Sequence, residues 1–230
     1  TGSILTGADI ADGSISTAKL ADTAVSTAKI ANDAVDNTKL DLTSNYAFTG
    51  TISGTSDVRL LSTVTLGNQA TADFTGIGSD YDVYMWQFSD IDTVSNCNML
   101  LRYSTDGGSS YESGSGTYEA AVRGYRSNNE FGTAPTTSDT KMQITFGGAV
   151  VDDSSDHNFS GCIYMASHNN SSTRCHFWWN LGYVSGDSGY ATGIYGAGSI
   201  RTISHNPNAI RFLPDSGNFQ SGKIKMYGWK

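Results

Sequence analysis

The sequence predicts a mainly β protein in which a short-period fibrous repeat is followed by a jelly-roll-like β-sandwich. The composition is the first reason: the 230 residues include only three glutamates (Glu112, Glu119 and Glu130) but 26 glycines and 12 tyrosines. Such a composition favours strands and turns over helices. The second reason is that short alternating apolar runs fill the chain from about Thr55 onward. The third is that residues 1–40 repeat every ten residues.

The large apolar residues of the repeat recur every five residues. They are Leu5, Ile10, Ile15, Leu20, Val25, Ile30, Val35 and Leu40. A step of five turns a side chain through about 500° on an α-helix and moves it to the opposite face of a strand. No single straight element therefore collects all of them on one side. Either the chain bends once or more per block, for example at Asp12-Gly13 or Asn32-Asp33, or several chains surround these side chains.

Forty residues with two large apolar side chains per ten cannot form a core alone. Disorder is one alternative that the composition allows. The regular spacing favours another, in which identical copies wind around a shared axis as a closed cyclic assembly. We expect residues 1–40 to form this shaft, residues 41–55 a transition segment and residues 56–230 a globular head.

The head is predicted to contain about ten strands and no amphipathic helix, which is typical of a β-sandwich. The strand-like runs are 58–66, 82–88, 97–104, 117–125, 141–147, 161–167, 174–184, 189–203, 208–213 and 222–229. One run places Met142, Ile144 and Phe146 on one face and Lys141, Gln143 and Thr145 on the other. The last run places Ile224 and Met226 opposite Lys223, Lys225 and Tyr227. Between two runs, Asp106-Gly107-Gly108 predicts a tight turn.

Several segments resemble bacteriophage tail fibre proteins. The blocks of the form DGSISTAKLAD resemble the short repeats of tail fibre shafts, and LTSNYAFTGTISG (42–54) resembles the step at which such shafts meet the next module. LRYSTDGGSSY (101–111) and the run 208–229 look like the distal globular domain. The resemblance implies a homotrimer in the virion, outside the cell, with a head that attaches to a host surface glycan or outer-membrane receptor. Other tail proteins would dock through a part preceding Thr1, because Thr1 is expected to begin a segment of a longer chain.

Aromatic residues of the head are the candidate ligand contacts. Trp178 and Trp179 are adjacent in a strand-like run, so their rings are expected on opposite faces. Tyr183, Tyr190 and Tyr195 follow in a glycine-rich stretch. Flat rings beside Asn, Asp and Ser suit the faces and hydroxyls of sugars, whereas the same residue types also form adaptable protein-binding surfaces. Burial of these rings at subunit contacts is the other alternative.

Other chemistries are disfavoured. The net charge of −8 argues against nucleic acid or anionic lipid as the main partner, and no run suggests membrane insertion. Cys97, Cys162 and Cys175 are too irregularly spaced for a disulfide framework and are expected to be free thiols. The spacing of Cys162, His168, Cys175 and His176 does not suit zinc. The group Asp152, Asp153 and Asp156 lacks the glycine and bidentate glutamate of a calcium loop.

No cofactor, metal or enzymatic activity is expected, since no stretch groups two carboxylates around an apolar pocket and no G-x-S-x-G elbow occurs. Three alternatives to receptor binding stay open. They are a structural module that only caps the trimer, a polysaccharide depolymerase and a secreted bacterial adhesin.

Overall fold

The computed structural model describes residues 11, 14–16, 57–128, 131–145, 151, 157–186, 189–203 and 205–230. The chain divides into two units, residues 1–54 and 55–230. In the first unit Ile15 is described and is 53% exposed. The transition segment, the two expected turn sites and the other shaft residues lie outside the described residues. Those shaft residues are Leu5, Ile10, Leu20, Val25, Ile30, Val35 and Leu40.

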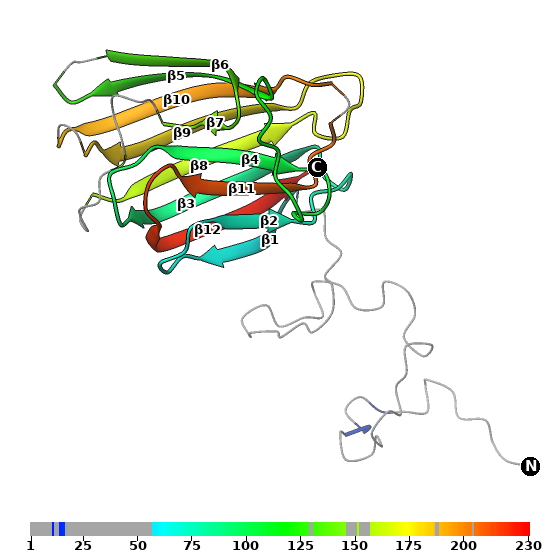
Figure 1. Ribbon diagram of the computed structural model, residues 1–230. Helices are drawn as coiled ribbons and strands as arrows, with labels where there is room; N and C mark the ends of the chain where they lie inside the picture. The colour runs from blue at the N-terminus through cyan, green and yellow to red at the C-terminus, as the bar shows by residue number, and fades with distance from the viewer. Residues whose placement is uncertain are drawn as a thin grey trace, which may run out of the picture. The chain divides into compact units, whose positions relative to one another are not determined.

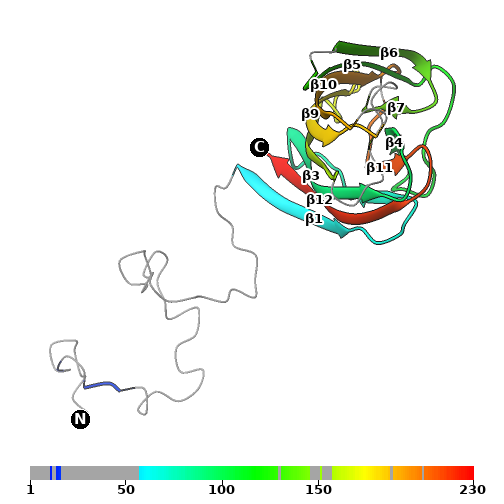
Figure 2. The same ribbon diagram turned by 90° about the vertical axis from the view of Figure 1, so that its left-hand side faces the viewer.

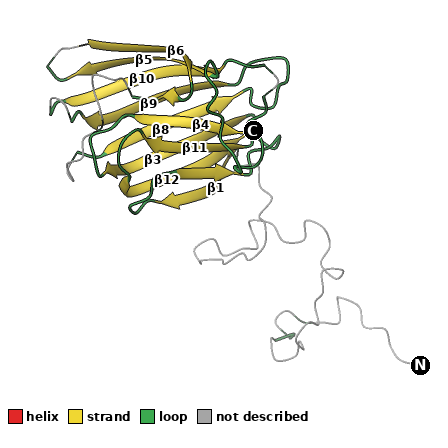
Figure 3. Ribbon diagram, in the orientation of Figure 1, coloured by secondary structure: helices red, strands yellow, loops and turns green. Residues whose placement is uncertain are grey.

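The second unit consists of two antiparallel sheets (Figure 1). The large sheet has the order β1-β12-β3-β8-β9-β10-β5-β6 and the small sheet the order β2-β11-β4-β7. The strands are β1 (Val58–Thr65), β2 (Ala72–Thr75), β3 (Val83–Thr93), β4 (Met99–Ser104), β5 (Tyr118–Arg126), β6 (Phe131–Asp139), β7 (Met142–Gln143), β8 (Phe159–Ala166), β9 (His176–Val184), β10 (Ala191–Ile200), β11 (Ala209–Pro214) and β12 (Phe219–Trp229). The described residues form strands, turns and loops but no helix (Figure 3), which confirms the prediction of a mainly β fold.

Successive strands alternate between the two sheets. β1 and β3 lie in the large sheet and β2 and β4 in the small one, while β7 and β11 of the small sheet are followed by β8 and β12 of the large one. Two further pairs, β5–β6 and β9–β10, extend the large sheet beyond β8. Figure 2 shows the large sheet curving around the small one, so the side chains between the sheets form one core.

Aromatic rings fill the centre of this core. Phe212 of β11 has no exposed surface. Its ring centroid lies 6.1 Å from that of Phe74, 5.7 Å from that of Trp86 and 4.9 Å from that of Phe88, each pair edge to face. Such pairs stabilise a core beyond the burial of their area. One side chain therefore joins β2, β3 and β11 across the sandwich.

Two strands were not predicted from the sequence. β2 has only four residues, too few for an alternating pattern to stand out. β6 contains Pro135, a residue that argues against an interior strand. β6 is the last strand of the large sheet, where one edge is unpaired and proline is tolerated.

The expected faces are confirmed in β12, where Ile224 and Met226 are buried. The prediction for run 141–147 is partly wrong: among its described residues, 141–145, the strand is limited to Met142–Gln143, and Thr145 is buried instead of facing outward. The Thr145 hydroxyl accepts a hydrogen bond from the backbone N–H of Met99 at 3.1 Å. A hydroxyl satisfied in this way can be buried at little cost. Phe146 lies outside the described residues.

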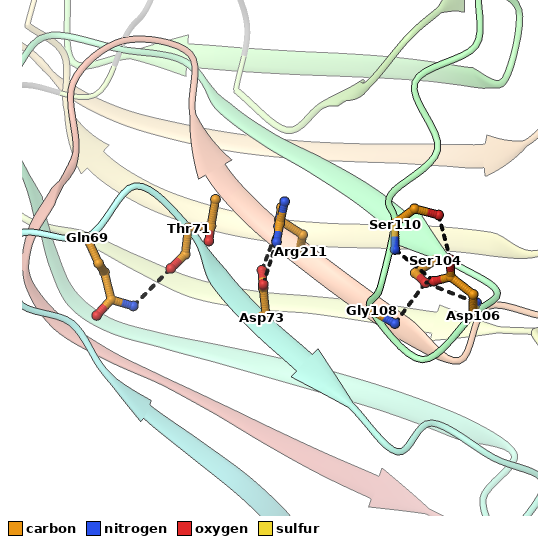
Figure 4. Close-up of polar contacts among 8 residues, drawn as sticks. All are labelled: Gln69, Thr71, Asp73, Ser104, Asp106, Gly108, Ser110 and Arg211. Atoms are coloured by element: carbon orange, nitrogen blue, oxygen red, sulfur yellow. Dashed lines mark hydrogen bonds and ion pairs between the residues drawn. The ribbon is translucent and has the colours of Figure 1, made fainter.

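The predicted tight turn after β4 is confirmed. Gly107 and Gly108 have φ angles of 75° and 92°, which only glycine adopts without strain. The Asp106 carboxylate accepts hydrogen bonds from the hydroxyls of Ser104 and Ser110, each at 2.6 Å, and from the backbone N–H of Ser110 at 2.9 Å (Figure 4). These hydrogen bonds, that from Ser104 first, lower the pKa of Asp106. Asp106 thus shapes the loop and has little capacity left for a ligand.

Candidate functional site

β9 places its two adjacent tryptophans on opposite faces, as predicted. Trp179 is 3% exposed and Trp178 is 41% exposed. Trp179 lies in the core, where a Cβ added at Gly196 would come within 2.4 Å of its ring. The absence of a side chain at Gly196 therefore makes room for the indole.

The five candidate binding residues divide into two groups. Trp179 and Tyr183 point into the core, and Tyr183 packs edge to face on Phe159 with ring centroids 6.2 Å apart. The prediction that these two contact a surface ligand is corrected, because both lie on the inward face of β9 and their side chains are buried in the core. Trp178, Tyr190 and Tyr195 are exposed, by 41%, 42% and 51%.

The outer face of the large sheet carries an aromatic row. We use this name for residues paired in register across five neighbouring strands: Leu60, Tyr227, Met85, Tyr164 and Trp178. Tyr164 and Trp178 stack face to face, with ring centroids 5.2 Å apart and planes 7° apart. Trp229 meets the Tyr164 ring edge on at 5.9 Å. The row forms a largely apolar strip across five strands of the sheet.

A groove of about 460 Å³ adjoins the row on strands β8, β9, β10 and β5. We call it the glycine groove, after its floor. It is lined by Tyr125, Ser160, Gly161, Cys162, Tyr164, Asn180, Leu181, Gly182 and Gly193. Tyr164 on β8 and Tyr125 on β5 stand on strands at opposite sides of β9 and β10.

Two of these glycines shape the groove differently. The Tyr125 ring covers Gly193, because a Cβ at Gly193 would come within 2.7 Å of that ring. A Cβ at Gly182 would meet nothing within 4 Å. Gly182 therefore keeps an open space over the floor, and a side chain there would fill the groove without a clash.

The groove combines ring faces with hydrogen-bonding groups. Asn180 is exposed and offers an amide that both donates and accepts. The Ser160 hydroxyl accepts a hydrogen bond from the backbone N–H of Asp90 at 3.1 Å and keeps its own proton to donate. Burial raises the pKa of Cys162, so its thiol stays protonated near neutral pH and does not act as a nucleophile. These groups suit non-covalent binding.

A second hollow of about 480 Å³, which we call the end pocket, lies where four loops meet. Its lining is Ile77, Gly78, Thr105, Glu112, His168, Asn169, His205, Asn206, Pro207 and Asn208. Of the four residues whose spacing was judged unsuited to zinc, His168 lines this pocket, whereas Cys162 lines the groove and Cys175 is buried. Among the described residues no three His, Cys, Asp or Glu side chains form a group that could hold a metal ion.

The buried histidine of the end pocket predicts a pH-dependent stability. Burial lowers the pKa of His168 below its ordinary value of 6.5. When the pH falls below about 6.5, His168 takes up a proton more readily in the unfolded chain than in the native protein, so protonation favours unfolding. The stability that the neutral, buried His168 allows is therefore present above about pH 6.5 and is lost as the pH falls. We expect the thermal unfolding midpoint to fall between pH 7.5 and pH 5, and to fall further in the wild type than in His168→Gln.

The glutamine variant is a matched control, since its amide can still donate to the backbone carbonyl of Gly78. Asp106 and Glu119 have lowered pKa values and ordinary values of 3.8 and 4.5, so they titrate below this pH window. Differential scanning calorimetry at both pH values gives the comparison. Equal falls in the two proteins would show that His168 does not carry the effect.

Three further described carboxylates, Asp73, Glu119 and Asp215, form ion pairs or hydrogen bonds with other side chains or backbone groups of the head. Asp73 forms a two-pronged ion pair with Arg211, at 2.7 Å to Nε and 2.6 Å to Nη2 (Figure 4). The Arg211 guanidinium in turn lies 3.9 Å from the Tyr111 ring centroid, which fastens the loop after β4 to the small sheet. Glu119 bonds Arg174 at 2.7 Å and the Ser199 hydroxyl at 2.6 Å. Asp215 accepts hydrogen bonds from Asn98. These groups hold the fold together.

The sequence analysis did not single out several residues of the groove. Tyr125 and Tyr164 lay within predicted runs, but only the strand order brings them to the same surface. The signal that could have indicated them is alternation, since both occupy outward positions of their strands. Gly182 and Gly193 carried no signal beyond the glycine content of the stretch.

None of the protein-family models, curated protein sequences or solved structures with which the chain was compared matches it. No segment of the described residues forms an apolar helix of the length needed to cross a membrane.

Proposed function

We propose that this chain is the distal segment of a bacteriophage tail fibre, which attaches the virion to the host cell surface by multivalent, non-catalytic binding. In this proposal residues 1–40 form a homotrimeric shaft and residues 56–230 form the receptor-binding head. The ligand is a surface glycan held in the glycine groove and against the aromatic row. Other tail proteins are the further partners in this proposal.

The order of the strands supports a jelly-roll-like head. β1-β12-β3-β8 faces β2-β11-β4-β7, and the chain changes sheet eight times between β1 and β12, an order that resembles a double Greek key. The pairs β5–β6 and β9–β10 are then insertions that widen one sheet. Because the groove lies on β8, β9, β10 and β5, it depends mostly on these inserted strands.

The observation that carries the proposal is the glycine groove between exposed rings. Sugar rings present C–H faces that pack on aromatic rings and hydroxyls that pair with amides and hydroxyls. The groove supplies both through Tyr125, Tyr164, Asn180 and Ser160. Its volume of about 460 Å³ lies within the range of small-ligand sites.

Gly182→Val is expected to weaken binding to host cells or isolated surface polysaccharide at least about tenfold, with the thermal midpoint unchanged. Valine suits a strand, and its side chain enters the open space over the groove floor without meeting another atom at Cβ. The measurement is binding of the labelled full chain to a panel of bacterial cells and purified lipopolysaccharides.

Gly67→Val is the matched control, because a Cβ at Gly67 also meets nothing within 4 Å and Gly67 does not line the groove. It is expected to bind like the wild type. Equal binding by Gly182→Val and wild type would remove the groove from the proposal. Absence of binding across the whole panel would favour the purely structural module, and release of soluble sugar on incubation would favour a depolymerase.

A further inference from the structure

A second row of side chains runs beside the aromatic row on the outer face of the large sheet. On β12, β3, β8 and β9 each of its members stands two residues along the strand from a member of the aromatic row, so both point the same way. We call it the polar row, and none of its members is buried. It is paired in register across six neighbouring strands and consists of Lys225, Gln87, Cys162, Asn180, Tyr195 and Arg123.

The two rows extend the glycine groove toward β12. Tyr164 of the aromatic row lines the groove, as do Cys162 and Asn180 of the polar row. The groove lies on β8, β9, β10 and β5, whereas both rows continue over β3 and β12 (Figure 1). From β12 to β5 there are five strand spacings of about 4.8 Å, which give about 24 Å. A ligand that fills the groove alone therefore covers only part of this surface.

Cations lie at both ends of the polar row. Lys225 stands at the β12 end and Arg123 at the β5 end, and Lys223 follows two residues from Lys225 on the same exposed face of β12. In the described part of the chain neither lysine forms an ion pair. Neither row contains a carboxylate. The two rows therefore carry only positive charge.

Glu119 and Asp90 adjoin this surface, and neither reverses its charge. Glu119 pairs with two cations, Arg174 at 2.7 Å and Arg201 at 3.7 Å. Asp90 is exposed where the register of β3 shifts, and it stands alone against the lysines of β12. Exposed charges farther away than about 8 Å are largely screened at physiological salt. The net charge of −8 of the whole chain therefore does not set the potential over the two rows.

The chemistry of the two rows suits a charged polysaccharide. The rings can pack on the C–H faces of sugars, and the amides of Gln87 and Asn180 can pair with hydroxyls. The Tyr227 hydroxyl donates to the Gln87 amide oxygen at 3.3 Å, which leaves the Gln87 amide protons for a ligand. An acidic group on a sugar can pair with Lys225 or Arg123. A nucleic acid would bring a phosphate with every nucleotide, more charge than these cations match.

We propose that the outer face of the large sheet binds a stretch of a linear, negatively charged polysaccharide, which lies across the strands along the two rows. This inference rests on the proposed function and deepens it, because it specifies the class of glycan and the direction in which the polymer is held. One part of the polymer occupies the glycine groove. Its acidic groups meet Lys223, Lys225 and Arg123.

The charge of the ligand is tested with surface polysaccharide from the strains that the full chain binds, separated by anion exchange into neutral and acidic fractions. Isothermal titration calorimetry on the full chain measures the affinity for each fraction and for single-stranded oligothymidylate. We expect the acidic fraction to bind at least about tenfold more tightly than the neutral fraction. Replacing both lysines of β12, Lys223→Gln with Lys225→Gln, is expected to weaken binding of the acidic fraction about tenfold.

Lys141→Gln with Lys230→Gln is the matched control. It changes the net charge by the same amount, and neither lysine belongs to the two rows or lines the groove. We expect this control to bind the acidic fraction like the wild type. An undiminished affinity in the variant that lacks Lys223 and Lys225 would remove the two rows from the binding surface.

The extended arrangement is tested with fragments of the acidic fraction. Fragments about 30 Å long cover the rows and are expected to bind at least about tenfold more tightly than fragments about 10 Å long. Gly182→Val is expected to weaken both lengths. The variant that lacks Lys223 and Lys225 weakens only the long fragments, because both lysines lie on β12, outside the groove. This difference separates the rows from the groove.

The remaining outcomes distinguish this inference from the proposed function. A neutral fraction that binds as tightly as the acidic one would overturn the assignment of charge, and equal affinities for short and long fragments would overturn the extended arrangement. In both cases attachment to a glycan would stand. Tighter binding of oligothymidylate than of any polysaccharide would assign the rows to nucleic acid. If the full chain binds none of the strains, the proposed function falls and this inference falls with it.

Discussion

Phe212→Ala is expected to lower the free energy of unfolding by about 3–5 kcal/mol, the range for removing a fully buried phenylalanine. The Phe212 ring is the common contact of Phe74, Trp86 and Phe88, which come from β2 and β3. Its loss leaves a cavity between the sheets where these rings cannot all close together. Because domains of this kind are stable by about 5–15 kcal/mol, the variant would be marginally folded.

Urea unfolding of the wild type and the variant measures this difference. Tyr190→Ala is the control, since Tyr190 is an aromatic residue that is 42% exposed. Its effect is expected to stay within about 0.5 kcal/mol, as for other surface substitutions. A loss below about 1 kcal/mol in Phe212→Ala would mean that the two sheets do not pack around this ring.

Removal of residues 1–54 is expected to weaken binding to host cells by about 10²- to 10⁴-fold, the usual gain from linking binding modules. In the proposed function the first unit holds the heads together, so a chain that begins at Thr55 binds through one head at a time. The affinity of each head for a soluble ligand is expected to stay the same, because the second unit has its own core.

Surface plasmon resonance separates avidity from the affinity of a single head. Avidity is measured with the protein flowing over immobilised host polysaccharide, and the affinity of one head with soluble ligand flowing over immobilised protein. Fusing residues 55–230 to an unrelated three-stranded coiled coil provides the control and is expected to restore the lost strength. Equal binding by the full chain and the truncated chain would contradict the role of the first unit in avidity. Failure of the coiled-coil fusion to restore binding would show that the first unit contacts the receptor itself.

The fold class followed from local patterns, whereas the pairing of strands did not. Alternation in KIKMYGW correctly placed Ile224 and Met226 inside, since a strand turns successive side chains to opposite faces. Thr145 broke the same rule because its hydroxyl found partners inside the protein, a non-local contact that periodicity does not encode. β6 escaped prediction because its proline is acceptable only at a sheet edge.

The candidate site was predicted only in part. Adjacent tryptophans had to face opposite sides, but the sequence contains no indication of which face of β9 meets the core. Trp178 is exposed and Trp179 is buried because the small sheet packs on one face only. The groove could not be foreseen, since it requires β5 to pair with β10 over a long separation in sequence. The end pocket likewise depends on loops that only the fold brings together.

The central claim is that the repeat of residues 1–40 associates identical chains. The period places an apolar side chain at every fifth position, and Ile15, the shaft residue that the structure describes, is 53% exposed in the single chain. Association would cover such side chains, which a lone chain of this composition cannot bury.

Sedimentation equilibrium of the chain of 230 residues, over a range of concentrations, tests this claim most directly. The account predicts that the full chain sediments with three times the 24.4 kDa of one chain. The chain without residues 1–54 is predicted to sediment as a single shortened chain. A mass of 24.4 kDa for the full chain at every concentration would contradict it.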